Sequence, residues 1–201
     1  GQRIALTAGS RGIVNIATIL KATADTLKEL GAQPFIVPTM GSHGGATAEG
    51  QRNVLKNIGI TEESTGVPIL SSLEVIQIGT TADGVPVYLD KHASEADGIL
   101  VVARVKPHTD FEGPIESGLM KMMVIGLGKH KGALAAHRGA MTRGFQHTFP
   151  SIARIVLKEA RIIGGLAVVE NADDQTAKIE AVKREEVEER EMELLVLAKR
   201  L

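Results

Sequence analysis

The sequence contains no cysteine and no tryptophan, and only one tyrosine and four phenylalanines among its 201 residues. Without cysteine the chain has no disulfide, no thiolate metal ligand and no thiol nucleophile, so a metal site would have to use imidazole or carboxylate groups. The few aromatic rings and a formal net charge of -1 provide neither stacking surfaces nor a basic patch for nucleic acid. We therefore expect no nucleic-acid partner.

Long apolar runs are also missing. No segment approaches the roughly 18 apolar residues that span a membrane, and no basic segment followed by an apolar core opens the chain. We expect a cytoplasmic protein with no membrane partner. The chain begins at Gly1 without a methionine, immediately before an apolar segment, and ends at Leu201 within a predicted helix. These two features predict that residues 1–201 are a fragment of a longer protein.

Apolar runs and helical spacing alternate along the chain, and this alternation predicts an α/β fold. The expected strands of the main sheet are 3–8, 34–38, 98–103, 162–169 and 177–182. The expected helices are 14–30, 46–58, 150–160 and a last one that has glutamates in its opening turns and ends at Lys199-Arg200. Strands that alternate with helices form a largely parallel sheet flanked by helices.

Two further strands interrupt this alternation. Residues 74–80 and 85–90 flank Asp83-Gly84, a dipeptide suited to a tight turn with positive φ. We expect a β-hairpin inserted into the α/β unit.

The segment 106–138 is polar and rich in glycine, histidine and lysine, and includes Lys121, His130 and His137. A loop of this length inside a compact domain is usually functional or disordered. Its glycines and apolar residues favour order. We expect an ordered, functional loop here.

Glycine-rich loops follow the first two predicted strands. Gly9-Ser10-Arg11-Gly12 could offer backbone N–H groups and a guanidinium to a phosphate or carboxylate. Gly41-Ser42-His43-Gly44-Gly45 surrounds one histidine with small residues, which leaves the imidazole open to a ligand. His108 follows the third strand. Because parallel α/β sheets bind ligands at the carboxyl ends of their strands, we expect Arg11, His43 and His108 along one edge.

The chemistry of these histidines is not assigned by their spacing. Imidazole exchanges protons near neutral pH, and in its neutral form it also ligates nickel, zinc or iron. The hydrolase motifs HExxH and GxSxG are absent, and no full GxGxxG follows a strand. His92 and His147 lie among charged or polar neighbours without glycines, so we expect both at the surface.

Four motifs, taken in order, resemble the amino-terminal domain of the nickel-dependent lactate racemase family. They are Gly41-Ser42-His43, Pro107-His108, Lys121-Met122 and His137, which lies 16 residues beyond the lysine. Together with the alternating strands, the resemblance covers nearly the whole chain. It implies that residues 1–201 form one domain of a two-domain protein, with the carboxyl-terminal domain of the same protein as the missing partner.

The resemblance also implies how a cofactor is held. In that family a lysine forms a thioamide-type bond to a nickel-pincer nucleotide, which is a pyridinium mononucleotide, and one histidine ligates the nickel. By match of motif, Lys121 would anchor the cofactor and His137 would be the metal ligand. His130 competes for that role because it is nearer to the lysine in sequence. Ser10 and Arg11 would help to hold the cofactor or a substrate anion.

Two other histidines of the family act as acid and base on the substrate hydroxyl, and the matching residues are His43 and His108. The implied function is racemisation or epimerisation of a small 2-hydroxy acid by reversible hydride transfer to the cofactor. Two such groups are needed because the hydroxyls of the two enantiomers point to different sides. Two alternatives stay open. One is an enzyme with a bare ion on His43, His108 and His137, and the other is a non-catalytic domain that binds a small molecule or phosphate.

Overall fold

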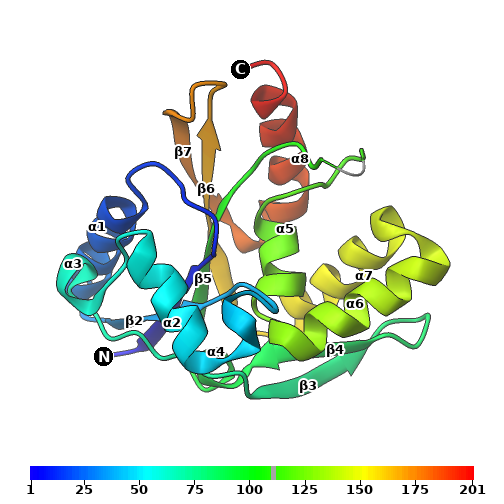
Figure 1. Cartoon of the computed structure of the whole chain (residues 1–201), viewed down its shortest axis with the longest axis horizontal. Coiled ribbons are helices and arrows are strands. Elements are labelled where there is room, and N and C mark those ends of the chain that lie inside the picture. The colour runs from blue at the N-terminus through cyan, green and yellow to red at the C-terminus, as the bar shows by residue number, and fades with distance from the viewer. Residues whose placement is uncertain (110–111) are drawn as a thin grey trace.

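The computed structural model describes residues 1–109 and 112–201 (Figure 1). The strands are β1 (Arg3–Ala8), β2 (Gln33–Pro38), β3 (Val75–Thr80), β4 (Pro86–Asp90), β5 (Gly98–Arg104), β6 (Ile162–Glu170) and β7 (Thr176–Lys183). The α-helices are α1 (Ile16–Glu29), α2 (Ala48–Asn57), α3 (Glu62–Thr65), α4 (Lys91–Ser94), α5 (Leu119–Lys121), α6 (Lys129–Arg143), α7 (Phe145–Glu159) and α8 (Val187–Ala198). Shorter turns are the 3₁₀ helices η1 (Gly44–Ala46) and η3 (Arg184–Glu186) and the π-helical turn η2 (Met122–Gly126). None of the helices in these described ranges is both long and apolar enough to cross a membrane.

Five strands form one sheet in the order β2-β1-β5-β6-β7. β1 is parallel to β2 and to β5, and β5 is parallel to β6, whereas β7 pairs with β6 in the antiparallel direction. β3 and β4 form a separate antiparallel hairpin. The predicted α/β fold, a largely parallel sheet flanked by helices with a β-hairpin added, is confirmed.

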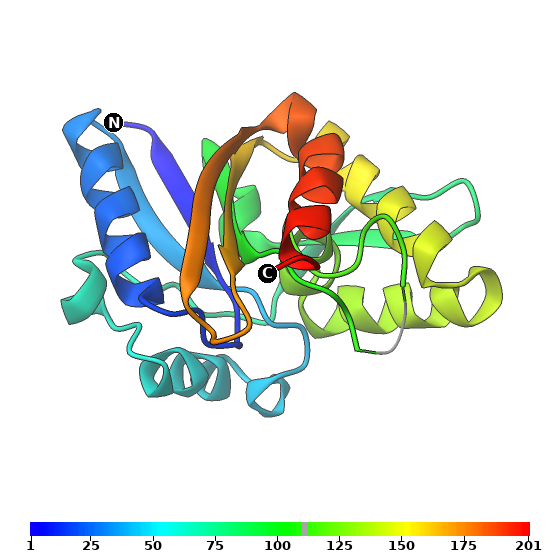
Figure 2. The same ribbon diagram turned by 90° about the horizontal axis from the view of Figure 1, so that it is seen from above.

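The sheet separates two hydrophobic clusters, because successive side chains of a strand point to opposite faces. In β1, Ile4 and Leu6 belong to a cluster shared with α1 and α2. Ala5, between them, belongs to the other cluster, which is shared with α5, η2, α6, α7 and α8. Figure 2 shows α1 (blue) and α8 (red) on opposite sides of the sheet. Both faces of the sheet are therefore covered, which leaves its edges and ends for ligands.

Helix α1 illustrates how the sequence builds this layer. Its buried residues Ile16, Ile19, Leu20 and Ala24 recur at helical spacing, so that one stripe packs on the sheet. The chain leaves the helix through Gly31, whose φ of 81° lies in the left-handed region that glycine adopts without strain. This turn returns the chain to the sheet for β2.

The interpretation of residues 106–138 as one long loop is wrong. Helical structure begins at Leu119 and runs through α5, η2 and α6 to Arg143. The buried apolar residues recur at the spacing of a helix and are Leu119, Met120, Met123, Val124 and Leu127. Glycines between and after them hid the pattern, because a glycine in sequence usually marks a turn.

Helix α7 also differs from its predicted bounds. It begins at Phe145, and Pro150, which was expected to start it, lies inside it. Proline is common in the first helical turn because it has no N–H to donate, so the sequence favoured a start there. The carbonyl that loses its partner is that of Gln146, at the beginning of the helix, where the loss disturbs the fewest turns.

Candidate active site

Three loops that carry predicted site residues leave the sheet at the same edge. Ser10 and Arg11 follow β1, His43 follows β2 and His108 follows β5. These strands are parallel neighbours, so their carboxyl ends lie side by side. Arg11 and His43 are exposed at this edge, and Ser10 and His108 are half-buried.

Ser10 and His43 are in direct contact. Ser10 Oγ lies 2.5 Å from His43 Nδ1, which fixes the orientation of the imidazole. Whichever group donates, this bond engages Nδ1 and leaves Nε2 as the ring nitrogen that can exchange a proton with a ligand. The geometry suits an exposed imidazole that acts as an acid or base.

The backbones of His108 and Gly113 both contact a buried carboxylate, that of Glu116. The backbone N–H of His108 donates to Glu116 Oε2 over 2.7 Å, and the N–H of Gly113 donates to Oε1 over 3.0 Å. Lys199 Nζ, at the end of α8, lies 2.6 Å from the same Oε1. Burial alone would raise the pKa of Glu116, but these three hydrogen bonds lower it below its ordinary value. Glu116 therefore stays ionised and holds the backbone of His108.

Lys121 ends α5, immediately before the π-helical turn η2. Its side chain is half-buried, and its Nζ lies 3.4 Å from Ser117 Oγ. Single π-helical turns are rare and occur frequently at functional sites. The predicted cofactor lysine thus lies at an unusual point of the backbone.

The amino end of the Lys121 helix is held by Glu191 of α8. Glu191 is 1% exposed, and its Oε2 accepts from the N–H of Met120 over 2.8 Å. Burial raises the pKa of Glu191 to about 7, against the backbone hydrogen bonds, which lower it. A Cβ at Gly118 would lie 2.5 Å from the carboxyl carbon of Glu191, so only glycine fits beside it.

His137 is exposed on α6, and its ring packs on two aromatic residues of α7. The ring meets Phe145 and Phe149 edge-on, with centroid distances of 5.7 and 6.3 Å. These contacts restrain the plane of the imidazole. His130 is exposed on the same helix face, two turns or about 10 Å earlier along the axis.

The loops at the sheet edge pack directly against the segment that follows Lys121. A Cβ at Gly41 would lie 3.0 Å from Ile125 Cγ2 and 3.5 Å from Ala133 Cβ. A Cβ at Gly9 would lie 3.0 Å from Met122 Cε. The structure therefore brings the loops of Ser10 and His43 against η2 and the first turns of α6.

Charged side chains of both signs lie beside the loop of His108, namely Arg104, Lys106, Glu170 and Asp174. Arg104 pairs with the buried carboxylate of Glu170. Burial lowers the pKa of Lys106, and repulsion from Arg104 and Arg11 lowers it further. Arg104 and Lys106 line a pocket of about 230 Å³. Asp174 and Glu170 partly offset this repulsion, so Lys106 and Arg11 are the cations nearest to His108 that are left for a substrate anion.

Sequence reasoning missed Lys106, Glu116 and Glu191. Lys106 is adjacent to the Pro107-His108 motif, so its place beside a candidate anion site was open to inference. The two carboxylates gave no signal, because acidic residues in polar or helical segments are usually solvated. The partner of Glu191, Met120, is 71 residues away.

The described residues 1–109 and 112–201 contain no group of three or more His, Asp or Glu side chains placed to hold a metal ion. His43, His108 and His137, although all described, thus do not form a three-ligand site. A metal held here would need ligands from elsewhere.

Residues 5–148 match the family model of the lactate racemase N-terminal domain. The chain belongs to this family. The matched range contains all of the residues predicted for the site, which are Ser10, Arg11, His43, His108, Lys121 and His137. A comparison with curated protein sequences gives no match.

The fold is that of lactate racemase. The structure of the lactate racemase apoprotein from Thermoanaerobacterium thermosaccharolyticum matches with a TM-score of 0.69 at 18% sequence identity. The match covers 96% of this chain and 48% of the lactate racemase chain. This lactate racemase N-terminal domain therefore spans about half the length of that relative.

Proposed function

We propose that the full-length protein racemises or epimerises a 2-hydroxy acid with a nickel-pincer nucleotide as cofactor. The match of residues 5–148 to the lactate racemase N-terminal domain carries this proposal. Support comes from the Ser10–His43 contact at the sheet edge and from the packing of the His43 loop against the segment after Lys121.

The residues present fit such a cofactor. A pincer ligand brings most of the donors to its nickel, so the protein has to supply one amine for attachment and one imidazole for the metal. Lys121 would supply the amine from a helix whose amino end Glu191 holds. His137 would supply the imidazole, with Phe145 and Phe149 restraining its ring. A bare ion on three histidines is disfavoured, because no three-ligand group occurs among the described residues.

When bound, the cofactor would supply reversible hydride exchange with the substrate α-carbon, which makes a planar 2-oxo acid common to both enantiomers. His43 and His108 would each take and return the proton of the substrate hydroxyl, one for each enantiomer. Ser10 would keep the ring of His43 oriented. Arg11 and Lys106 would attract the substrate carboxylate.

The carboxyl-terminal domain would complete this site. The chain corresponds to 48% of the lactate racemase chain that it matches, and its candidate residues lie at an open sheet edge. We expect the other half of the protein to cover that edge and to exclude water from it.

The acid/base roles are tested by replacing each histidine in the full-length, cofactor-loaded protein. His43→Asn and His108→Asn should each slow the loss of optical activity of a 2-hydroxy acid by about 10²- to 10⁴-fold, the usual contribution of a positioned acid or base. The measurement is circular dichroism of the substrate, started from either enantiomer. His92→Asn, in α4 and away from the sheet edge, is the control. Wild-type rates in both His43→Asn and His108→Asn would rule out the assignment.

A further inference from the structure

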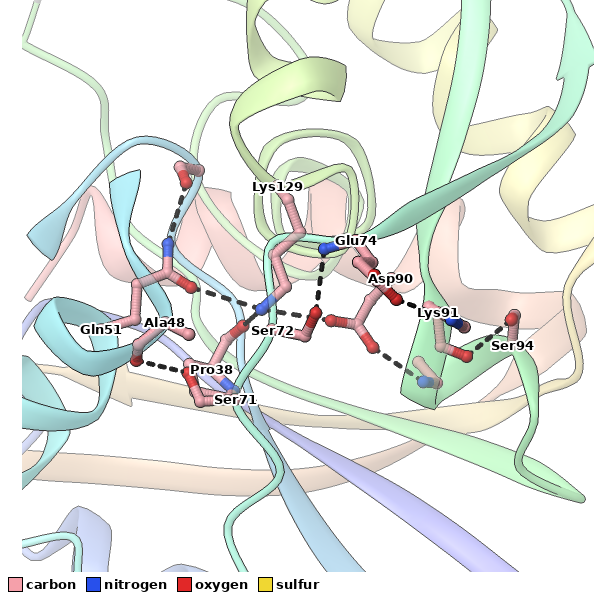
Figure 3. A network of polar contacts seen from close by, with 12 residues as sticks. Pro38, Ala48, Gln51, Ser71, Ser72, Glu74, Asp90, Lys91, Ser94 and Lys129 are labelled. Carbon is pink, nitrogen blue, oxygen red and sulfur yellow. Dashed lines mark hydrogen bonds and ion pairs between the residues drawn. The ribbon is translucent and has the colours of Figure 1, made fainter. Parts of the chain in front are cut away.

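Lys129 is a fully buried lysine that lies between three elements of the fold. Figure 3 shows its side chain descending from α6 between Gln51 of α2 and Asp90 of β4. Its Nζ lies 3.1 Å from Asp90 Oδ2 and 3.3 Å from Gln51 Oε1, and it also donates to the carbonyl of Pro38 at the end of β2. Burial lowers the pKa of Lys129, although Asp90 opposes this.

Gln51 extends this network to the candidate catalytic loop. Its Nε2 donates to the carbonyl of Gly41 over 2.9 Å and lies 3.4 Å from the carbonyl of His43. The side chain of Gln51 is itself completely buried. A single amide therefore accepts from the Lys129 ammonium and donates to the backbone on either side of Ser42.

Asp90 extends the network in the other direction. Its Oδ1 accepts from the N–H of Ala93 over 2.8 Å and caps α4. Its backbone N–H donates to the carbonyl of Leu127 over 2.7 Å, at the end of η2. Asp90 thus connects the Lys129 ammonium to the segment that runs from Lys121 to α6.

Burying this ion pair carries a desolvation cost. Both charged groups are fully shielded from water, and desolvation of a buried ion pair often exceeds the attraction between its members. Lys129 also has a φ of 54°, in the left-handed region that is unfavourable for a residue with a Cβ. The unfavourable backbone conformation and the buried charge of Lys129 together motivate the hypothesis that this residue fixes a particular geometry.

We propose that Lys129, with Asp90 and Gln51, is a positioning residue that fixes the His43 loop relative to the segment carrying Lys121 and His137. The catalytic meaning of this proposal rests on the proposed function. Its structural consequence, an immobilised loop 39–43, does not.

The hydrogen bonds between Lys129 and the His43 loop are best interrupted at Gln51. Removing Lys129 or Asp90 instead would leave one member of a buried ion pair without its partner, which is strongly destabilising in itself. Gln51→Leu in the full-length protein keeps Lys129 and Asp90 and removes the hydrogen bonds of the Gln51 amide to the carbonyls of Gly41 and His43. Asn53→Leu makes the same amide-to-leucine change at an exposed position of the same helix and is the matched control.

Two quantities are measured in both variants. We expect hydrogen exchange of the backbone amides of 39–46 to rise about tenfold or more in Gln51→Leu, because the loop opens locally, and not in Asn53→Leu. In the cofactor-loaded protein, kcat should fall by about 10- to 100-fold with a smaller change in KM, since a displaced acid/base group affects the chemical step most. Attachment of the cofactor at Lys121, followed by intact mass, should be unchanged.

Exchange rates and kcat in Gln51→Leu equal to those of Asn53→Leu would overturn the proposal. If Gln51→Leu does not fold, Gln51→Glu decides in the same way, because its carboxylate can accept from Lys129 but cannot donate to the carbonyls of Gly41 and His43. If the wild-type protein racemises no 2-hydroxy acid, the proposed function fails, and the exchange measurement alone still decides the positioning role.

Discussion

Buried ionisable side chains contact the backbone at the periphery of the candidate site. Glu191 is the clearest example, because it joins α8 to the helix that carries Lys121. Its pKa is raised to about 7, first by burial and also by repulsion from Glu188, against the backbone hydrogen bonds from Met120 and Leu119. A carboxyl group with this pKa titrates within the range in which enzymes work, so it couples the stability of the site to pH.

This coupling has a definite sign. Between pH 4.5, the ordinary value for a glutamate, and pH 7 the unfolded chain releases the proton of Glu191 while the folded chain retains it. The free energy of unfolding should therefore fall by about 3 kcal/mol across this window, and level off above it. Glu191→Gln should lack this fall, because its amide does not titrate.

The measurement is urea denaturation of both proteins at pH values from 4.5 to 8. The unfolding free energies of wild type and Glu191→Gln should be similar at pH 4.5, and wild type should become the less stable of the two as the pH rises to 7. Glu189→Gln, at an exposed position of the same helix, should follow the wild-type curve. A difference that does not change with pH would show that Glu191 is ionised throughout.

The candidate site was predictable at the residues whose local sequence is unusual. His43 lies among glycines, and Arg11 and His108 follow predicted strands, so their common edge followed from the strand order. Lys129 and Glu191 were not predictable, because lysine and glutamate are almost always solvated and their burial depends on partners distant in sequence. The roles assigned to the individual residues stay predictions.

At the scale of elements, the π-helical turn η2 connects Lys121 to α6 and hence to His137. Its close packing depends on glycine. A Cβ at Gly128 would lie 2.4 Å from the carbonyl oxygen of Val124 and 3.0 Å from the Cα of Gly132. The backbone at Gly128, between η2 and α6, has no room for a methyl group, and a shift there would change how η2 joins α6.

Gly128→Ala should therefore destabilise the protein by about 1–3 kcal/mol, the usual cost of overpacking. Gly12→Ala is the control, because nothing lies within 4 Å of its Cβ position and its φ is not positive, so its effect should be within about 0.5 kcal/mol. Urea denaturation of each variant beside wild type gives both changes in the free energy of unfolding. Equal midpoints for the two variants would mean that η2 adapts freely and does not set the spacing of the site.

Strands and amphipathic helices were predicted within a few residues, since their periodicity is local. β1, β2, β5 and α1 are examples. The helices from Leu119 to Arg143 were missed because several glycines are packed inside helical structure there. At these positions a side chain would meet η2, Tyr88 or the β3–β4 hairpin. The hairpin is distant from these glycines in sequence, so its contacts become visible only in the folded chain.

At the scale of the whole molecule, the covered sheet leaves its carboxyl edge as the place for chemistry. The loops of β1, β2 and β5 meet there, and the packing of Gly41 on Ile125 and Ala133 brings the helical segment of Lys121 against them. Arg11 and His43 are exposed at this edge, in a chain that spans about half of the lactate racemase chain that it matches.

The proposed function requires that Lys121 anchor a nickel-containing cofactor in the full-length protein. The most direct test is the intact mass and nickel content of the protein produced together with the cofactor-making machinery and nickel. We expect an added mass and bound nickel in wild type and in Lys158→Ala, an exposed control on α7, and the loss of both in Lys121→Ala. An unmodified mass in the wild type, or an added mass that survives Lys121→Ala, would contradict it.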